Sequence, residues 1–227
     1  MTARSAPARI VSLVPSVSET LLAWGVTPVA VTRFCEQPHL EAVGGTKNPD
    51  VAAIASLRPD VVVMDREENR AEDAAALEAA GIALLVLHVR SLDDVAPELQ
   101  RLAAVAGVHL PPLAMKSTMA TRCAAWIPIW RRPWMTINAA TYGSSLLAAA
   151  GVANIYADNP APYPTVTLEE AAARRPDVVL APSEPYPFSA RQQQELETVA
   201  PVVFVDGKDL FWWGARTPGA LERLQAL

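Results

Sequence analysis

The most chemically active stretch of the sequence is a run of polar residues directly after an apolar segment. Arg66, Glu67, Glu68 and Asn69 follow the segment 60–64, which predicts a strand. In open α/β sheets, ligands bind beyond the carboxyl ends of the strands. There the cluster would hydrogen-bond amide groups of a ligand, offer carboxylates to a metal or pair with a cation. The alternative is a solvated helix start, because the helix dipole favours acidic side chains near its N-terminus.

Histidine and cysteine are scarce, which limits metal and acid–base chemistry. Of three histidines, only His88 stands at the end of a predicted strand. His88 with Glu67 or Glu68 is the one plausible set for proton transfer, as in metal insertion into a tetrapyrrole. Cys35 would suit a soft metal, although a lone cysteine is more often a small apolar filler. We therefore predict no catalytic residue and no metal site.

Aromatic residues make up 6% of the chain, yet several stand in loops after predicted strands. Rings bury a large area, which suits a flat, partly apolar ligand. The alternative is that Phe211 and Trp212 pack into the core. Trp126, Trp130 and Trp134 are expected to pack a connecting helix against its lobe. The predicted ligand contacts are Pro15, Ser16, Phe34, Cys35, Arg66, Glu67, Glu68, Tyr142, Glu184, Tyr186, Phe188, Phe211, Trp212 and Trp213.

Composition and charge exclude several classes of protein. The 227 residues are 51% hydrophobic and 19% charged, which is typical of a folded chain with one large domain or two small lobes. A formal net charge of −5 argues against a nucleic-acid partner. Two cysteines exclude a disulfide framework. The sequence contains no run of 18 apolar residues, so it predicts no membrane span.

The chain contains two copies of one pattern. The segment RPDVVVM at 58–64 reappears as RPDVVLA at 175–181. Each copy follows an alanine-rich stretch that predicts a helix, at 51–57 and 168–174. Repetition in the same order indicates two lobes built on the same plan.

Capping residues mark where the predicted helices begin. Asp50 and Thr167 stand at N-cap positions, and Thr167 with Glu170 fits a capping box. The segment 16–19, Ser-Val-Ser-Glu, predicts another capping box. Glycines such as Gly25 predict the helix ends.

These elements predict an α/β fold of two similar Rossmann-like lobes, with parallel sheets flanked by helices. Short continuous apolar runs are typical of parallel strands covered on both faces. A helix at 111–127, opened by Pro111-Pro112, would connect a lobe at 1–110 to a lobe at 128–227, with a ligand cleft between them. The predicted strands are 9–13, 28–32, 60–64, 83–87, 133–138, 177–181 and 201–205.

Four segments together resemble a known family. They are RIVSLVPSVSETLLAWG, VGGTKNPDVAAIASLRPDVVVMDREENRAEDAAALEAAGI, VTLEEAAARRPDVVLAPSEPYPF and VDGKDLFWWG. They are similar to the helical-backbone (class III) solute-binding proteins, which serve ABC importers of vitamin B12 and iron-siderophores. The resemblance implies two α/β lobes joined by one long helix, with the ligand in the cleft between them.

The resemblance also bears on a transporter partner. Family members dock on their permease through one acidic residue on each lobe. Glu72 matches the first of these positions by its context Asn69-Arg70-Ala71-Glu72. The second stretch, 211–216, offers no carboxylate. An ABC permease therefore remains a weaker expectation than the small-molecule ligand.

The start of the chain bears on location. The apolar run at 10–14 is too short for a secretory signal, and no lipid-attachment cysteine follows it. A native start at Met1 predicts a cytoplasmic protein. A different start would make it periplasmic or lipid-anchored.

These observations predict a cytoplasmic carrier or sensor of a corrinoid (cobalamin-like) or related metal chelate, with no required cofactor. One alternative is an exported binding protein of an ABC importer, for cobalamin or an iron-siderophore, whose signal has been removed. The other is a chelatase-like enzyme on a two-lobe α/β fold.

Overall fold

The computed structural model describes residues 8–111 and 119–227. The chain divides into two compact units, Met1–Val89 with Asp94–Leu113 and Arg90–Asp93 with Ala114–Leu227. We refer to them as the N-terminal unit and the C-terminal unit. Within the described ranges, no helix has the length and apolar character needed to cross a bilayer.

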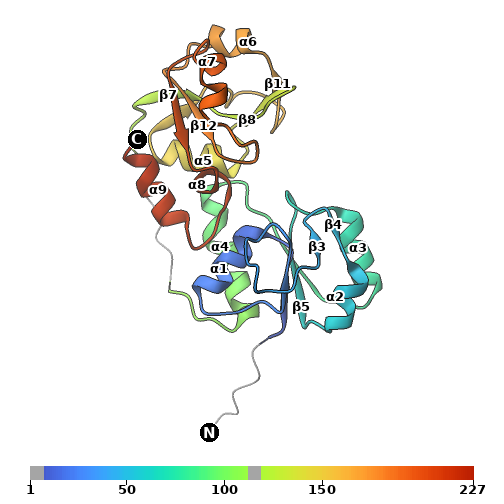
Figure 1. Ribbon diagram of the computed structural model, residues 1–227. Coiled ribbons are helices and arrows are strands. Elements are labelled where there is room, and N and C mark those ends of the chain that lie inside the picture. Colours follow the sequence, from blue (N-terminus) through green and yellow to red (C-terminus); the bar gives the residue numbers. More distant parts are fainter. Residues whose placement is uncertain (1–7, 112–118) are drawn as a thin grey trace. The chain divides into compact units, whose positions relative to one another are not determined.

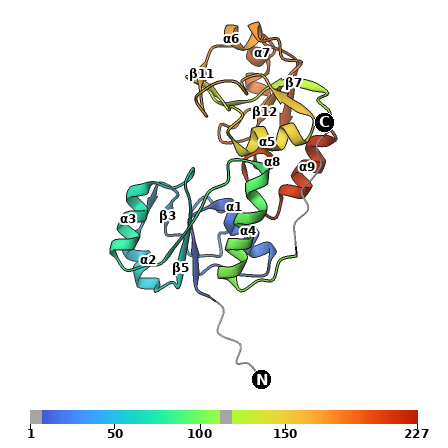
Figure 2. The ribbon, with the colours of Figure 1, turned by 180° about the vertical axis from the view of Figure 1, so that it is seen from behind.

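The N-terminal unit is built on a four-stranded parallel sheet in the order β2-β1-β5-β6. In both views, α1 and α4 lie on one side of β5, and α2 and α3 lie on the other (Figures 1 and 2). The sheet is therefore covered on both faces, as its continuous apolar strands predict. The elements are β1 (Ile10–Ser12), α1 (Pro15–Ala23), β2 (Ala30–Val31), β3 (Gly44–Gly45), β4 (Asn48–Pro49), α2 (Val51–Leu57), β5 (Val61–Asp65), α3 (Ala71–Ala79), β6 (Leu84–Leu87) and α4 (Leu92–Ala106).

The C-terminal unit has a second parallel sheet, in the order β10-β7-β12-β13. A separate antiparallel sheet, in the order β11-β9-β8, lies within the same unit. The elements are β7 (Cys123–Trp126), β8 (Pro128–Trp130), β9 (Trp134–Thr136), α5 (Tyr142–Ala149), β10 (Val152–Asn154), β11 (Thr165–Val166), α6 (Leu168–Ala173), β12 (Val178–Pro182), the short 3-10 helix η1 (Ala190–Gln192), α7 (Gln193–Leu196), β13 (Val202–Val205), α8 (Gly207–Phe211) and α9 (Thr217–Gln225).

The two Arg-Pro-Asp segments fold alike, which explains the repeat. The Asp60 carboxylate accepts a 2.7 Å hydrogen bond from the N–H of Arg9, just before β1. The Asp177 carboxylate accepts one of the same length from the N–H of Ala124 in β7. Arg58 and Arg175 both take the left-handed conformation, with φ of 46° and 51°. Each copy therefore ends a helix and ties the next strand to its neighbour.

The α/β fold of parallel sheets flanked by helices is confirmed, and so are two of the predicted caps. The Asp50 side chain accepts a hydrogen bond from the N–H of Ala53. Thr167 and Glu170 exchange the two hydrogen bonds of a capping box. The capping box at 16–19 is wrong, because α1 begins at Pro15 and the Ser18 hydroxyl bonds the Val14 carbonyl instead.

The connecting helix predicted over 111–127 is wrong at its C-terminal end. Cys123–Trp126 form β7, which pairs with both β10 and β12. A short apolar run has no periodicity that separates helix from strand, and pairing with two neighbours decides it here. Residues 112–118 lie outside the described residues. The domain bounds therefore stay a prediction.

The segment 133–138 is a strand, but not in a parallel sheet. Trp134–Thr136 pair antiparallel with β8 and β11. The parallel positions are taken by β7 and β10, neither of which the sequence analysis predicted. The C-terminal unit therefore repeats the plan of the N-terminal unit and adds a small antiparallel sheet to it.

Candidate functional site

Several charged and polar side chains of the N-terminal unit lie at the carboxyl end of β5. Asp65 is the last residue of this strand and is 2% exposed. Its Oδ1 accepts a 2.8 Å hydrogen bond from the N–H of Glu67, while its Oδ2 is buried without a hydrogen-bond partner. Burial raises the pKa of the Asp65 carboxyl to about 7; the bond from Glu67 opposes the rise, and the charge of Glu68 adds to it. The sequence analysis missed Asp65, although a carboxylate closing an apolar strand was the available signal.

Asn69 organises the loops around this carboxyl group. Its Oδ1 accepts a 2.8 Å hydrogen bond from the N–H of Asp65. Its Nδ2 donates to the carbonyls of Leu13, at 3.2 Å, and Thr46, at 2.8 Å. One amide thus fixes the ends of β1 and β5 and the turn between β3 and β4, since it both accepts and donates.

Arg66, Glu67 and Glu68, which the sequence placed at the site, are exposed around Asp65. His88 Nε2 lies 3.8 Å from Glu67 Oε1, so the histidine–carboxylate pair expected for proton transfer is present. Desolvation raises the pKa of Glu68, and the charge of Lys47 opposes this. Among the residues that the structure describes, no group of three or more metal-ligating side chains occurs.

The remaining predicted contacts of this unit differ in exposure. Phe34 is 50% exposed and carries the Arg33 guanidinium 5.0 Å from its ring centre. Pro15 is half-buried and Ser16 is buried in the first turn of α1. Cys35 is buried, with its Sγ 3.1 Å from a serine hydroxyl and 3.2 Å from a threonine hydroxyl, those of Ser18 and Thr32. Phe34 is therefore the exposed ring among the predicted contacts of this unit, and its contact with a ligand stays a prediction.

In the C-terminal unit, five rings form a continuous chain from the core to the surface. Trp126 is buried, and its ring centre lies 5.6 Å from that of Trp134. Trp134 stacks on Phe188 at 5.9 Å, and Phe188 lies 4.7 Å from Tyr186. Tyr186 meets the exposed Trp130 edge-on at 5.8 Å. Phe188 is thus a core residue, while Tyr186 is half-buried beside the surface.

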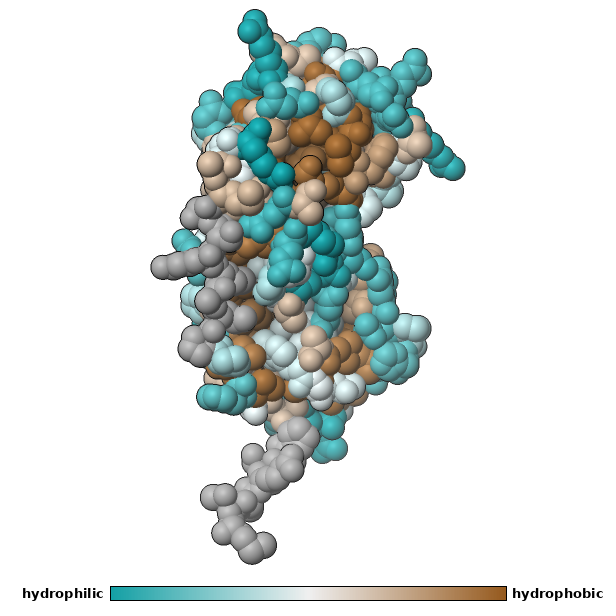
Figure 3. Space-filling model, turned by 90° about the vertical axis from the view of Figure 1, so that its left-hand side faces the viewer, coloured by the Kyte–Doolittle hydropathy of each residue, from teal (hydrophilic) through white to brown (hydrophobic). Residues whose placement is uncertain are grey.

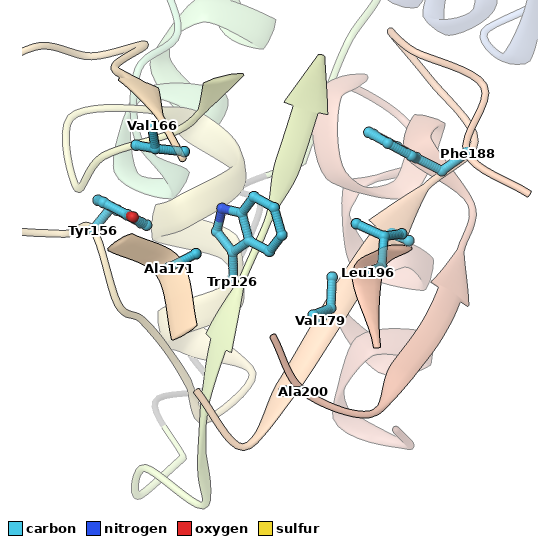
Figure 4. Close-up of a cluster of buried hydrophobic side chains, with 9 residues drawn as sticks. Trp126, Tyr156, Val166, Ala171, Val179, Phe188, Leu196 and Ala200 are labelled. Carbon is cyan, nitrogen blue, oxygen red and sulfur yellow. The ribbon is translucent and has the colours of Figure 1, made fainter. Parts of the chain in front are cut away.

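The core of this unit surrounds Trp126. Figure 4 shows its ring between Tyr156 and Ala171 on one side and Val179 and Leu196 on the other. These residues come from β12, from α6 and α7 and, for Tyr156, from the turn after β10. Trp126 was expected to pack a connecting helix, but it packs the sheet instead.

The loop after β13 places the last predicted rings. Trp212 is half-buried, with Lys208 Nζ 4.7 Å and the Arg216 guanidinium 5.7 Å from its ring centre. Phe211 is half-buried and Trp213 is buried. Trp213 is thus a core residue, whereas Phe211 and Trp212 each keep part of their surface exposed.

Two further predicted contacts lie deeper. Tyr142 is buried on α5, and its hydroxyl lies 3.0 Å from that of Thr217. Burial raises the pKa of this phenol. Glu184 is half-buried, and its backbone passes so close to Gly207 that a Cβ there would lie 2.5 Å from the Glu184 nitrogen. Within each unit, most of the predicted residues follow the parallel strands, in loops or in the next helix, whereas Tyr142 follows the antiparallel strand β9. The cleft that would bring the two sets together stays a prediction.

Comparison with known proteins finds relatives that are described as binding proteins. No protein-family model matches the chain. A vitamin B12-binding protein of Pectobacterium carotovorum is 25% identical to this chain. The match covers 97% of this chain and 87% of that protein. The solved periplasmic vitamin B12-binding protein BtuF of Vibrio cholerae has a TM-score of 0.78 at 22% identity, covering 97% of this chain and 96% of its own. A periplasmic heme-binding protein, BhuT, solved with two hemes, has a TM-score of 0.80 at 20% identity and covers 97% of both chains.

The resemblance stated from the sequence is confirmed. Homologues of the chain are vitamin B12-binding proteins, and its structural neighbours include periplasmic heme-binding proteins. The cytoplasmic location expected from the start of the chain finds no support in them. Relatives described as periplasmic match the exported alternative instead.

Proposed function

We propose that this chain, a homologue of vitamin B12-binding proteins, is an exported substrate-binding protein of an ABC importer that binds a corrinoid or heme. The observation that carries the proposal is the sequence similarity to a vitamin B12-binding protein over 97% of this chain. Both candidate ligands are broad, flat metal chelates with polar groups at their rims. The corrinoid comes first because the similarity in sequence is to corrinoid binders, whereas the likeness to the heme binder is one of fold.

The proposed contact surface of the N-terminal unit combines a ring with a cation. Phe34 exposes half of its surface and Arg33 covers part of its ring. The ring would pack on the ligand plane, where apolar area is buried at about 25 cal/mol per Å2. The guanidinium would pair with an acidic rim group, such as a propionate of heme or the phosphate of cobalamin.

The C-terminal unit offers a similar combination. Trp212 lies beside Lys208 and Arg216, and Tyr186 lies beside the exposed Trp130. Arg131, whose Nε bonds Glu195 at 2.8 Å, stands 5.9 Å from the ring centre of Trp134. Aromatic rings next to guanidinium and ammonium groups suit a ligand that is both flat and acidic.

A chelatase is the weaker candidate. Its one supporting observation is the 3.8 Å approach of His88 to Glu67. The relatives are binding proteins, which favours holding the chelate over inserting its metal. We therefore assign His88 and Glu67 to the polar rim of the binding surface.

The partner in this proposal is an ABC permease. Glu72, the position matched by the family resemblance, lies in the first turn of α3 and is well exposed. The Arg70 guanidinium lies 3.4 Å from it, and the pKa of the Glu72 carboxyl is lowered by its own backbone N–H and by Arg70. This carboxylate is therefore ionised and accessible for a basic surface.

Absorption titration tests the proposed ligand class. Purified protein is mixed with cyanocobalamin, hemin or a ferric siderophore, and the visible spectrum is followed to saturation. We expect a saturable change with one of the two macrocycles at one ligand per chain. A response to the siderophore alone would move the ligand to another chelate class, and no response to any of the three would overturn the proposal.

A further inference from the structure

The hairpin between β8 and β9 presents an exposed tryptophan beyond the parallel sheet of the C-terminal unit. β8 follows β7 after one residue, Ile127, and lies against β12. Its last residue, Trp130, meets Tyr186 edge-on at 5.8 Å, and Tyr186 belongs to the loop that follows β12. The turn of the hairpin therefore lies beyond the carboxyl ends of the parallel strands, where open α/β sheets bind ligands.

The ring of Trp130 is exposed and is held in place by other rings. The residue is 44% exposed, in a hairpin and not against the connecting helix that the sequence analysis expected. Tyr186 supports it from one side and lies 4.7 Å from Phe188, which stacks on Trp134 at the start of β9. A ring fixed by its neighbours loses little conformational freedom when a ligand packs on it. Trp130 is thus a preorganised apolar surface.

The first arginine of the turn has its partners within the protein. Arg131 donates from Nε to the Glu195 carboxylate at 2.8 Å, and its guanidinium also lies beside Tyr186. It stands 5.9 Å from the ring centre of Trp134. Glu195 therefore balances the charge of Arg131, which holds the turn against the rest of the unit.

The second arginine of the turn is exposed. Among the residues that the structure describes, Arg132 has no ion-pair partner. Its φ of 68° is left-handed, a conformation that glycine and asparagine take at the least cost in hairpin turns. The geometry of the turn therefore does not explain why the residue at this position is an arginine.

Two other left-handed arginines have a structural reason for their conformation. Arg58 caps α2, and Arg175 follows the last turn of α6, both in the Arg-Pro-Asp repeat. Arg132 ends no helix and stands between two antiparallel strands. Costly backbone conformations of this kind persist at functional sites, so an observed one supports a hypothesis of function.

We propose that Trp130 and Arg132 contact the ligand from the C-terminal unit, with the ring packed on the macrocycle and the guanidinium paired with an acidic group at its rim. The inference rests on the proposed function and adds a selection rule to it: the chelate that binds carries an acid near its edge. Heme carries propionates and cobalamin carries a phosphodiester. A guanidinium pairs with either oxyanion through charge-assisted hydrogen bonds.

Analogues that lack the acid test this assignment. Cobinamide is a corrinoid without the phosphodiester, and hemin dimethyl ester is a heme without free propionates. Absorption titration of the unchanged protein first identifies the macrocycle that binds. We then expect Arg132→Gln to weaken binding of the acid-bearing ligand about tenfold and binding of its acid-free analogue less than twofold. Trp130→Ala should weaken both forms about tenfold, because the ring contact does not depend on the acid.

Two residues of the same unit provide matched controls. Arg175→Gln removes an exposed arginine that is also left-handed, with a φ of 51°, at the opposite end of β12. Phe204→Ala removes a ring that is 41% exposed, within β13. Both variants should keep the affinity of the unchanged protein within about twofold.

Arg132→Gly separates binding from folding. Glycine takes the left-handed conformation without strain, so this variant should keep or raise the Tm. It should still lose affinity for the acid-bearing ligand as Arg132→Gln does. Full affinity in Arg132→Gly would contradict the pairing of Arg132 with the ligand.

The outcomes distinguish this inference from the proposed function. If neither macrocycle binds the unchanged protein, the proposed function is overturned and the assignment of the hairpin with it. If one binds, but Arg132→Gln weakens both forms equally or no more than Arg175→Gln does, the selection of an acid is contradicted and the proposed function stands. Equal affinities of Trp130→Ala and Phe204→Ala contradict the role of Trp130 in the same way.

Discussion

The backbone N–H of Asp65 donates a 2.8 Å hydrogen bond to the side-chain oxygen of Asn69. The same amide donates from its nitrogen to the carbonyls of Leu13 and Thr46. A single side chain therefore ties together three segments that are far apart in the sequence. Because only an amide supplies an acceptor and two donors in one planar group, asparagine at this position is a structural requirement.

Removing this amide is expected to destabilise the N-terminal unit. Asn69→Ala leaves a backbone donor and two carbonyls without their partner, at about 2 kcal/mol of the free energy of unfolding. Asn69→Asp keeps the acceptor and loses both donors, so it should lose a similar amount. Urea unfolding followed by circular dichroism measures both changes. A loss below about 0.5 kcal/mol for both variants would show that the three loops hold without Asn69.

The raised pKa of Asp65 predicts how stability depends on pH. The folded protein holds the Asp65 proton up to about pH 7, whereas the unfolded chain releases it near pH 4. The stabilising contribution of the protonated group is therefore full below pH 4 and is lost as the pH rises to 7. Asp65→Asn should gain stability relative to the unchanged protein, by about 1.5 kcal/mol at pH 5 and about 4 kcal/mol at pH 8.

Denaturant unfolding at both pH values checks this, with Glu41→Gln as the matched surface variant. A gain from Asp65→Asn that is the same at pH 5 and pH 8 would mean that Asp65 titrates normally in the fold.

The C-terminal unit contains a buried carboxylate, Asp209, whose pKa is shifted in the opposite direction to that of Asp65. The Asp209 carboxylate is buried and accepts hydrogen bonds from Arg223 at 2.6 and 2.7 Å and from Arg216 at 3.0 Å. The hydrogen bond from Arg223 lowers the pKa of Asp209, and both positive charges add to this. The ion pairs of Asp209 therefore stabilise the folded protein above about pH 4, and this stabilisation is lost as the pH falls below 4.

Asp209→Asn should lower the free energy of unfolding by about 2–3 kcal/mol at pH 7, because two guanidiniums lose their counter-charge. The loss should shrink as the pH is taken from 5 to 3. Thermal unfolding across this range measures it, and a pH-independent loss would contradict an ionic role for Asp209.

Substitution of Tyr142 tests whether this side chain stabilises the fold or contacts the ligand. Its buried hydroxyl pairs with Thr217 at 3.0 Å, so Tyr142→Phe should cost about 1 kcal/mol of stability. Thr217→Val should cost more, because the Thr217 hydroxyl also accepts from the N–H of Gly214. We expect cyanocobalamin affinity to change less than twofold in Tyr142→Phe. A tenfold loss of affinity with unchanged stability would return Tyr142 to the binding surface.

Phe34 is the sharpest test of the proposed binding surface. Phe34→Ala should weaken macrocycle binding about tenfold, which corresponds to about 1.4 kcal/mol of lost ring contact. Phe204→Ala is the matched control, because Phe204 lies in β13 of the other unit and is 41% exposed, close to the 50% of Phe34. Calorimetry compares the two variants, and equal losses would show that Phe34 has no special part in binding. The surface of the C-terminal unit also carries other hydrophobic residues (Figure 3), which makes this control necessary.

Elements with a strong local signal were predictable from the sequence. The strand predicted at 60–64 appears as Val61–Asp65, and the helix predicted at 51–57 appears at those positions. Apolar runs and capping residues act within a few residues of the chain, so they are readable without the fold. Strand β7 was not, because Cys123–Trp126 becomes a strand only by pairing with two segments at 152–154 and 178–179.

The sequence predicts where the site residues stand relative to the strands better than it predicts how deeply their side chains are buried. The loops after β5 and β12 were correctly placed at strand ends, since that follows from the sequence order. Whether a ring such as Phe188 faces ligand or core depends on Trp134 and Tyr186, which come to it through tertiary packing. The buried Asp65 was overlooked for the same reason: its burial depends on segments remote in sequence.

Calorimetric titration of the unchanged protein with cyanocobalamin and with hemin measures directly whether the chain binds a flat metal chelate. We expect one of the two to bind at one site per chain with a dissociation constant below about 1 μM, a free energy of about −8 kcal/mol. No measurable heat with either ligand at 100 μM protein, from a sample that is folded by circular dichroism, would contradict it.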